Sequence, residues 1–147
     1  MLAVFSRISD MDFDALLDVY SQSLDKNNWQ EVNTFFDDLQ LFFDNENVYL
    51  MQWVQENKVM AAMRLETYRD GYLITCLETD PNFRRKGCAY KLLNAVMTQF
   101  PGVYYSHVDK RNKPSLLLHQ KLGFEIYLNH AVYVDGSVYS GSVTLRK

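Results

Sequence analysis

A predicted strand passes through a basic turn into a predicted helix in the stretch Leu77-Glu78-Thr79-Asp80-Pro81-Asn82-Phe83-Arg84-Arg85-Lys86-Gly87-Cys88-Ala89. The start of a helix carries backbone N–H groups without intrahelical acceptors and the positive end of the helix dipole, so it can receive a phosphate. Gly87 lets the backbone approach an anion closely, and Ala89 leaves the helix start uncrowded. The phosphate loops GxxxxGK[ST] and GxGxxG are absent, and this short pattern alone also fits an exposed basic turn.

Hydrophobic periodicity extends this assignment in both directions along the chain. Upstream it predicts a strand at 2–8, a helix that Ser9 or Asp10 caps, a helix at 29–43, and strands at 48–55, 59–68 and 72–77. Downstream it predicts a helix at 89–100, a strand at 103–108, a helix at 115–122, and a final hairpin of 124–134 with 138–145. The expected fold class is α/β, with a mixed, mostly antiparallel central sheet and flanking helices.

Length and composition predict one folded domain that spans residues 1–147. Hydrophobic residues make up 48% of the chain and charged residues 22%, which favours a packed core over disorder. No apolar run approaches the roughly 20 residues of a membrane helix, and the apolar N-terminus is too short for a signal peptide. We therefore expect a cytoplasmic protein without a membrane partner.

The cysteines Cys76 and Cys88 lack metal-ligand spacing, so we expect reduced thiols and no metal.

Charge is distributed unevenly along the chain. Residues 1–50 hold ten acidic and two basic side chains, and the remainder holds eight acidic and thirteen basic ones. The basic excess gathers at 84–86 and 110–113, near two predicted helix starts. This asymmetry can bias where anions and cations bind, although solvated faces without a partner explain it equally well.

Two segments resemble the motifs of the GNAT family of N-acetyltransferases. Residues 84–89 resemble its signature [Gln/Arg]-x-x-Gly-x-[Gly/Ala]. Residues 112–124, Asn112-Lys113-Pro114-Ser115-Leu116-Leu117-Leu118-His119-Gln120-Lys121-Leu122-Gly123-Phe124, resemble its second motif, which has Asn, then Ser or Ala, then Leu-Tyr-x-Lys-x-Gly-Phe. The motifs have the family's order and separation, and the resemblance covers essentially the full chain. It implies the acyl-CoA N-acyltransferase (GNAT) fold, acetyl-CoA as cosubstrate and an amine as acceptor.

The resemblance also implies roles for single residues. Backbone amides of residues 85–89 would hold the coenzyme A pyrophosphate, and main-chain groups of the preceding strand would meet the pantetheine arm and polarise the thioester carbonyl. Asn112 would contact the pantetheine or orient a splayed strand, whereas basic side chains such as Lys113 would meet the nucleotide phosphates or stay solvated. The residues that it assigns to cofactor binding are Leu77, Thr79, Arg84, Arg85, Lys86, Gly87, Cys88, Ala89, Asn112 and Ser115.

The implied reaction is direct attack of a neutral amine on the acetyl group in a ternary complex, so it needs a base, an oxyanion donor and a source of a proton for the thiolate. His119 replaces the family's tyrosine, and it either donates that proton or packs against the thiol end of the cofactor. Glu78 and Glu66 are the candidate bases, the alternative being ordinary exposed carboxylates. Strand alternation puts Glu78 opposite Leu77 and Thr79. Reserve proton donors are Tyr104, Tyr105 and Tyr127, and His107 is a weaker candidate base.

The expected acceptor is a small-molecule or peptide amine, and Trp29, Asp37 and Asp38 favour a cationic or aromatic one. Homodimers are common in this family, so a homodimer is a further expectation. One alternative is a catalytically degenerate coenzyme A-binding sensor, in which His119 marks lost catalysis. A nucleic-acid-binding domain is the other, but the acidic pI of about 5.5 argues against a nucleic-acid partner.

Overall fold

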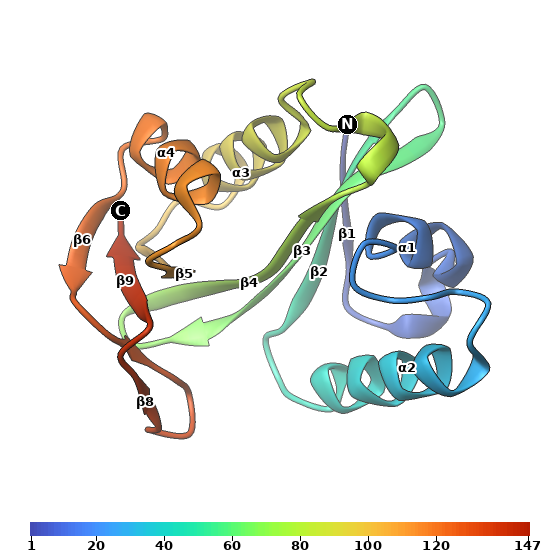
Figure 1. The fold of residues 1–147 in the computed structure, drawn as a ribbon, viewed down its shortest axis with the longest axis horizontal. Coiled ribbons are helices and arrows are strands. Elements are labelled where there is room, and N and C mark those ends of the chain that lie inside the picture. The colour runs from blue at the N-terminus through green and yellow to red at the C-terminus, as the bar shows by residue number, and fades with distance from the viewer.

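The computed structural model describes residues 1–147 and has a seven-stranded sheet in the order β1-β2-β3-β4-β5-β9-β6 (Figure 1). Every neighbouring pair is antiparallel except β4 and β5, which run parallel. The mixed, mostly antiparallel α/β class is therefore confirmed. The strands of this sheet are β1 (Leu2–Phe5), β2 (Tyr49–Gln55), β3 (Lys58–Tyr68), β4 (Gly71–Thr79), β5 (Tyr104–Asp109), β6 (Glu125–Leu128) and β9 (Ser142–Arg146).

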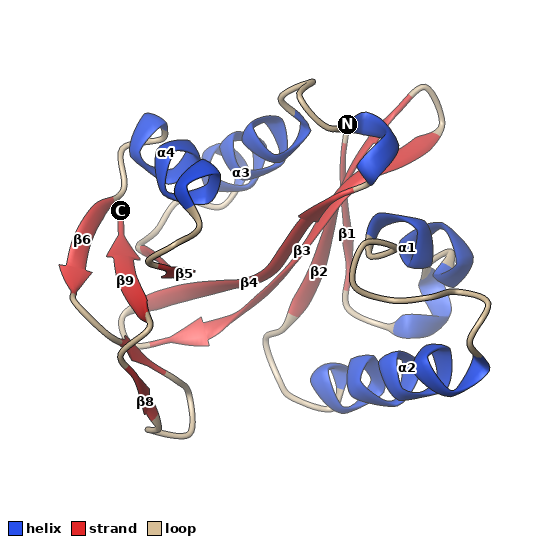
Figure 2. Ribbon diagram, in the orientation of Figure 1, coloured by secondary structure: helices blue, strands red, loops and turns tan.

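Four α-helices cover the two faces of the sheet, with α1 and α2 on one face and α3 and α4 on the other (Figure 2). The helices are α1 (Phe13–Val19), α2 (Trp29–Phe43), α3 (Cys88–Gln99) and α4 (Lys113–Lys121), and η1 (Ile8–Asp10) and η2 (Pro81–Phe83) are single 3-10 turns. None of these helices is long and apolar enough to cross a membrane.

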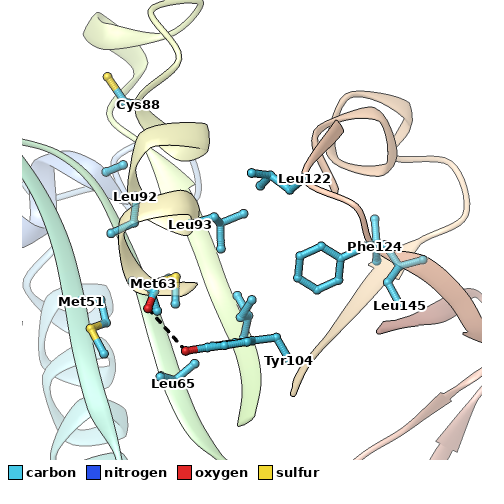
Figure 3. Close-up of a cluster of buried hydrophobic side chains, with 14 of the residues drawn as sticks. Met51, Met63, Leu65, Cys88, Leu92, Leu93, Tyr104, Leu122, Phe124 and Leu145 are labelled. Atoms are coloured by element: carbon cyan, nitrogen blue, oxygen red, sulfur yellow. Dashed lines mark hydrogen bonds between the residues drawn. The ribbon is translucent and has the colours of Figure 1, made fainter. Parts of the chain in front are cut away.

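Alternation along β3 divides the hydrophobic core between the two faces. Met63 and Leu65 pack with Leu92 and Leu93 of α3, and Phe124, which follows α4, belongs to the same cluster and lies near Leu145 (Figure 3). The intervening residue Ala62 instead packs against α1 and α2. Each face of the central strands is thus fixed by its own apolar cluster, which leaves the strand edges to shape the functional site.

Element boundaries agree with the predictions over most of the chain. The helix at 29–43 is confirmed at both ends, and the three predicted strands after it form β2, β3 and β4. The first strand was predicted too long, because the chain leaves the sheet after Phe5 and forms η1. The predicted caps Ser9 and Asp10 are also wrong. Asp12 caps α1, since its side chain accepts a hydrogen bond from the Ala15 N–H at 3.1 Å.

The predicted final hairpin is broken in both arms. Its base is the β6–β9 pair, whose β9 also pairs with β5, and its tip is a separate ribbon of β7 (Ala131–Val132) and β8 (Val138–Tyr139). Two hydrogen bonds fix the position of the segment between β6 and β9. The Thr144 hydroxyl donates to the His130 carbonyl at 2.7 Å, and the Tyr68 hydroxyl donates to the Val132 carbonyl. The ribbon is therefore attached to β3 rather than extending the sheet.

Candidate active site

The site begins where β4 and β5 separate. These two strands pair only from Tyr72↔Tyr104 to Ile74↔Ser106, although β4 continues to Thr79 and β5 to Asp109. The last residues of β4 consequently have a neighbouring strand on the β3 side only. An exposed strand edge of this kind presents N–H and C=O groups that need partners.

A β-bulge lies just beyond the point of separation. The β3–β4 register changes from Ala62↔Glu78 to Arg64↔Thr75, so β4 contains one extra residue in this interval. Cys76 lies within it and has a φ of 53°, in the left-handed region that residues with a Cβ rarely adopt. The bulge changes the direction of the β4 backbone where it passes the open edge.

Backbone direction assigns the groups that face this edge. The Asp80 N–H donates to the Met60 carbonyl at 2.8 Å, so the main chain of Asp80 points toward β3. Because these groups alternate along a strand, Glu78 also turns its main chain toward β3, whereas Leu77 and Thr79 turn theirs toward the open edge. The two residues expected to offer main-chain groups to a pantetheine arm therefore have this orientation.

The basic turn supplies a second set of backbone donors. Gly87, at the N-cap of α3, has a φ of 72°, and Arg85 has a φ of 63°. No side chain caps this helix, and the seven consecutive N–H groups from Arg84 to Tyr90 donate no hydrogen bond within the protein. A Cβ at Gly87 would meet no atom within 4 Å, so this turn is open. Free amides at the start of a twelve-residue helix form an anion site.

One open cavity of about 760 Å³ connects the strand edge, the basic turn and the start of α4. It is lined by Gln22, Leu77, Glu78, Thr79, Phe83, Arg84, Arg85, Gly87, Cys88, Ala89, Asn112, Pro114, Ser115 and Leu118. Ten of the thirteen predicted site residues are among them, and Lys86, His119 and Glu66 are not. Gln22, which follows α1, carried no motif signal in the sequence.

Cys88 contributes backbone rather than thiol chemistry to this cavity. Its side chain is buried, with Sγ 3.8 Å from Met60 Sδ and 3.8 Å from the Phe83 carbonyl oxygen. A buried thiol packed in this way behaves as a small apolar side chain. The Cys88 thiol is therefore part of the core packing.

Asn112 and Ser115 form the first turn of α4. The Asn112 side chain accepts a hydrogen bond from the Ser115 N–H at 3.2 Å, which makes Asn112 the N-cap of this helix. Both residues line the cavity, so the cap fixes the helix start against it. The structure thus shows Asn112 as a helix cap, and the two roles expected for it, contact with the pantetheine and orientation of a splayed strand, stay predictions.

His119 lies under α4 and is only 1% exposed. Its Nδ1 is 2.7 Å from the Ser115 carbonyl oxygen, and since a carbonyl only accepts, Nδ1 carries the hydrogen. The ring packs edge-on against Phe124 at 5.0 Å, and Nε2 has no partner. Burial lowers the pKa of His119, which favours the neutral ring. The structure therefore does not bring the expected proton donor to the cavity surface.

The three reserve tyrosines are also absent from the cavity lining. The Tyr104 hydroxyl donates to the Phe100 carbonyl at the end of α3, and the Tyr105 hydroxyl donates to Asp70. Tyr127 lies on β6, where the guanidinium groups of Arg69 and Arg146 approach its ring. His107, on β5, packs against the rings of Tyr68 and Tyr133.

Two half-buried carboxylates lie on the α1/α2 face of the sheet. Glu78 pairs with Ala62, whose side chain is in the α1/α2 cluster, so the predicted alternation of Glu78 against Leu77 and Thr79 holds. Glu66 is on the same face, but only Glu78 lines the cavity. Neither carboxylate has a hydrogen bond or an ion pair, and burial raises the pKa of both.

The other charged residues predicted to attract an acceptor are arranged differently. Asp38 forms an ion pair with the buried guanidinium of Arg64 at 2.8 Å, so its negative charge is compensated. Trp29 is 70% exposed at the first turn of α2, and Asp37 is exposed on the same helix. Asp38 is therefore neutralised, whereas Asp37, Glu66 and Glu78 have no ion pair.

Comparison with known proteins identifies similar chains. A family model described as the acetyltransferase (GNAT) family matches residues 12–124. No curated protein sequence matches significantly. Among solved structures, the ribosomal-protein-S18-alanine N-acetyltransferase from Escherichia coli is 19% identical with a TM-score of 0.66, covering 99% of this chain and 92% of that one.

Two further solved structures share the fold. An aminoglycoside 6'-acetyltransferase of type Ii is 14% identical with a TM-score of 0.72, covering 100% of this chain and 96% of that one. A PaiA N-acetyltransferase from Thermoplasma acidophilum, solved in complex with coenzyme A, is 11% identical with a TM-score of 0.65, covering 100% and 98%. The family model spans well over half of the sequence, and its range contains both motifs up to Phe124. This chain belongs to the GNAT family of acetyltransferases.

Proposed function

We propose that this protein is an N-acetyltransferase that transfers the acetyl group of acetyl-CoA to a small-molecule or peptide amine by direct attack in a ternary complex. The observation that carries the proposal is one cavity that is lined both by the unpaired edge of β4 and by five of the seven residues whose backbone amides are unpaired. A diphosphate and an extended amide-containing arm are the two parts of coenzyme A that need such partners. Acetyl-CoA would supply an activated acyl carbon.

The residues of the chain divide the binding of acetyl-CoA among them. The amides from Arg85 to Ala89 would hold the pyrophosphate, and Arg84 and Arg85, which line the cavity, would add charge. Leu77 and Thr79 would pair their main chain with the pantetheine amides along the open edge of β4. Binding would thereby satisfy both sets of free backbone groups.

The amine would approach from the α1/α2 face and lose its proton to Glu78, directly or through water. Glu78 is favoured over Glu66 because it lines the cavity beside Leu77 and Thr79. Its raised pKa brings the carboxylate closer to the pKa of an effective general base at neutral pH. Because its pKa is raised, Glu78 becomes ionised at a higher pH than an ordinary glutamate. Activity should therefore rise with pH through the pH range in which Glu78 loses its proton.

The departing thiolate does not need a dedicated acid from this chain. A thiol is far more acidic than an amine, with a cysteine thiol at a pKa of about 8.5, so the thiolate leaves readily and can take its proton from water. Ser115 lines the cavity, and because the His119 Nδ1 hydrogen is donated to the Ser115 carbonyl, the Ser115 hydroxyl hydrogen is free to be donated elsewhere. We therefore assign His119 to the support of α4 rather than to proton transfer.

Turnover itself is the direct test. The protein should consume acetyl-CoA in the presence of some member of a panel of polyamines, amino sugars, amino acids and peptides, measured as thiol release. Heat of acetyl-CoA binding without thiol release across the panel would contradict the enzyme proposal and favour a coenzyme A sensor. Acetylation restricted to anionic amines would contradict an acceptor face that holds the carboxylates Glu66 and Glu78.

Replacing Gly87 tests the phosphate turn, with Gly136 as a matched control. Both glycines have positive φ and no atom within 4 Å of an added Cβ, so Gly87→Leu and Gly136→Leu should share a strain of about 1–2 kcal/mol. Only Gly87→Leu should weaken acetyl-CoA binding in calorimetry, by about tenfold or more, because each lost charge-assisted hydrogen bond is worth about 1.5–3 kcal/mol. Equal affinities in the two variants would argue against a pyrophosphate at this turn.

Replacing Glu78 tests the base, with Glu66 as the matched carboxylate. Glu78→Gln should lower kcat about 10²-fold or more and remove the acidic limb of the pH–rate profile, because it abolishes general-base catalysis. Its acetyl-CoA affinity should stay unchanged, since the side chain lies opposite Leu77 and Thr79. Glu66→Gln should retain that acidic limb. A loss of the limb in Glu66→Gln alone would transfer the role to Glu66.

Replacing His119 by Asn keeps a donor near the Nδ1 position and removes the titrating ring. His119→Asn should lose far less than the roughly 10²-fold in kcat that removal of a general acid causes, and its pH–rate profile should keep its shape. A profile that loses its basic limb would make His119 the acid.

His119 also makes stability depend on pH. Folding lowers the pKa of His119 from 6.5, so the unfolded chain binds the proton more readily, and the stability of the wild type should fall as the pH drops below that value. In urea unfolding, the free energy of unfolding should fall less with decreasing pH in His119→Asn than in wild type.

A further inference from the structure

The β-bulge in β4 is held by one side chain from the opposite layer. The Tyr20 hydroxyl, at the end of α1, donates a hydrogen bond to the Cys76 carbonyl at 2.6 Å. Cys76 is the residue with positive φ in the bulge, 56 positions away in sequence. This long-range contact ties α1 to the part of β4 that borders the gap between β4 and β5.

The contact determines where the next N–H points. The Cys76 carbonyl and the Leu77 N–H belong to one planar trans peptide unit, so they point in opposite directions. With the carbonyl turned toward Tyr20, the Leu77 N–H points away from α1, and Leu77 is a residue of the cavity lining. Rotating this peptide would turn the N–H away from the cavity.

The Tyr20 side chain is itself rigidly placed. It is 6% exposed, and its ring packs against Phe35 of α2 at 5.4 Å within the α1/α2 cluster. Burial raises the pKa of its hydroxyl, so this group remains a hydrogen-bond donor and cannot serve as a base near neutrality. A fixed donor of this kind can stabilise an otherwise unfavourable backbone conformation at Cys76.

We propose that Tyr20 is a positioning residue for acetyl transfer, whose hydroxyl holds the Cys76–Leu77 peptide so that the Leu77 N–H polarises the thioester carbonyl. The inference rests on the proposed function. It assigns to α1 a role in preorganising the oxyanion donor, in addition to forming one wall of the acceptor face. Neither sequence motif includes Tyr20 or Cys76.

The test compares Tyr20→Phe with Tyr104→Phe in the full chain. Each variant removes one buried hydroxyl that donates to a backbone carbonyl, and Tyr104 lies away from the cavity. Infrared difference spectra of bound acetyl-CoA, labelled with ¹³C at the acetyl carbonyl, report polarisation without requiring turnover. Wild type and Tyr104→Phe should lower the carbonyl frequency relative to free acetyl-CoA, and Tyr20→Phe should return it toward the free value.

Kinetics give the second readout. Loss of a whole oxyanion donor costs about 10²–10³ in kcat, so a loosened donor in Tyr20→Phe should cost about tenfold, with the KM for acetyl-CoA unchanged. An unshifted carbonyl in wild type, or wild-type frequency and kcat in Tyr20→Phe, would overturn the role of Tyr20 and leave the proposed function standing. Failure of wild type to bind acetyl-CoA in calorimetry would overturn both.

Discussion

The site depends on the short pairing between β4 and β5. These are the only parallel neighbours in the sheet, and their pairing ends at Ile74 and Ser106 while both strands continue. Main-chain N–H and C=O groups inside a protein need partners, and in most sheets the next strand supplies them. Here β4 keeps its partner β3 on one side and loses β5 on the other. The gap therefore preserves a rigid strand with unsatisfied groups, which a ligand can complete without any rearrangement of the core.

The start of α3 likewise leaves main-chain groups without partners in the protein, here at a helix end rather than at a strand edge. Gly87 and Arg85 adopt positive φ, the helix lacks a side-chain cap, and its first amides remain free. A capping side chain here would stabilise the isolated protein by about 0.5–2 kcal/mol, so its absence leaves the anion site open at the expense of helix stability. The apolar cluster around Leu92 and Leu93 holds the helix in place instead. Packing thus secures both elements whose hydrogen bonding is incomplete.

The sequence predicted the parts of this arrangement that depend on local patterns. Helical periodicity placed α2 at 29–43, short turns placed the β2–β4 hairpins, and two motifs located most of the cavity lining. It did not predict the bulge, because a cysteine carries no preference for positive φ and Cys76 is held by a distant tyrosine. Nor did it predict that His119 is buried, since its helix has apolar residues on several sides. The broken C-terminal hairpin likewise depends on contacts of Thr144 and Tyr68 that no local pattern encodes.

The open edge of β4 and the α1/α2 face of the sheet divide the proposed reaction between them. The main-chain groups of Leu77 and Thr79 lie at the open edge of β4, whereas the carboxylates Glu66 and Glu78 lie toward α1 and α2. This division follows from strand geometry, because main-chain N–H and C=O groups point along the sheet and side chains point out of it. One short segment of β4 can therefore offer main-chain groups to a thioester and a carboxylate to an amine. The bulge is what keeps Thr75 and Glu78, three positions apart, on the same face, so the strand irregularity is part of the acceptor surface as well as of the donor site.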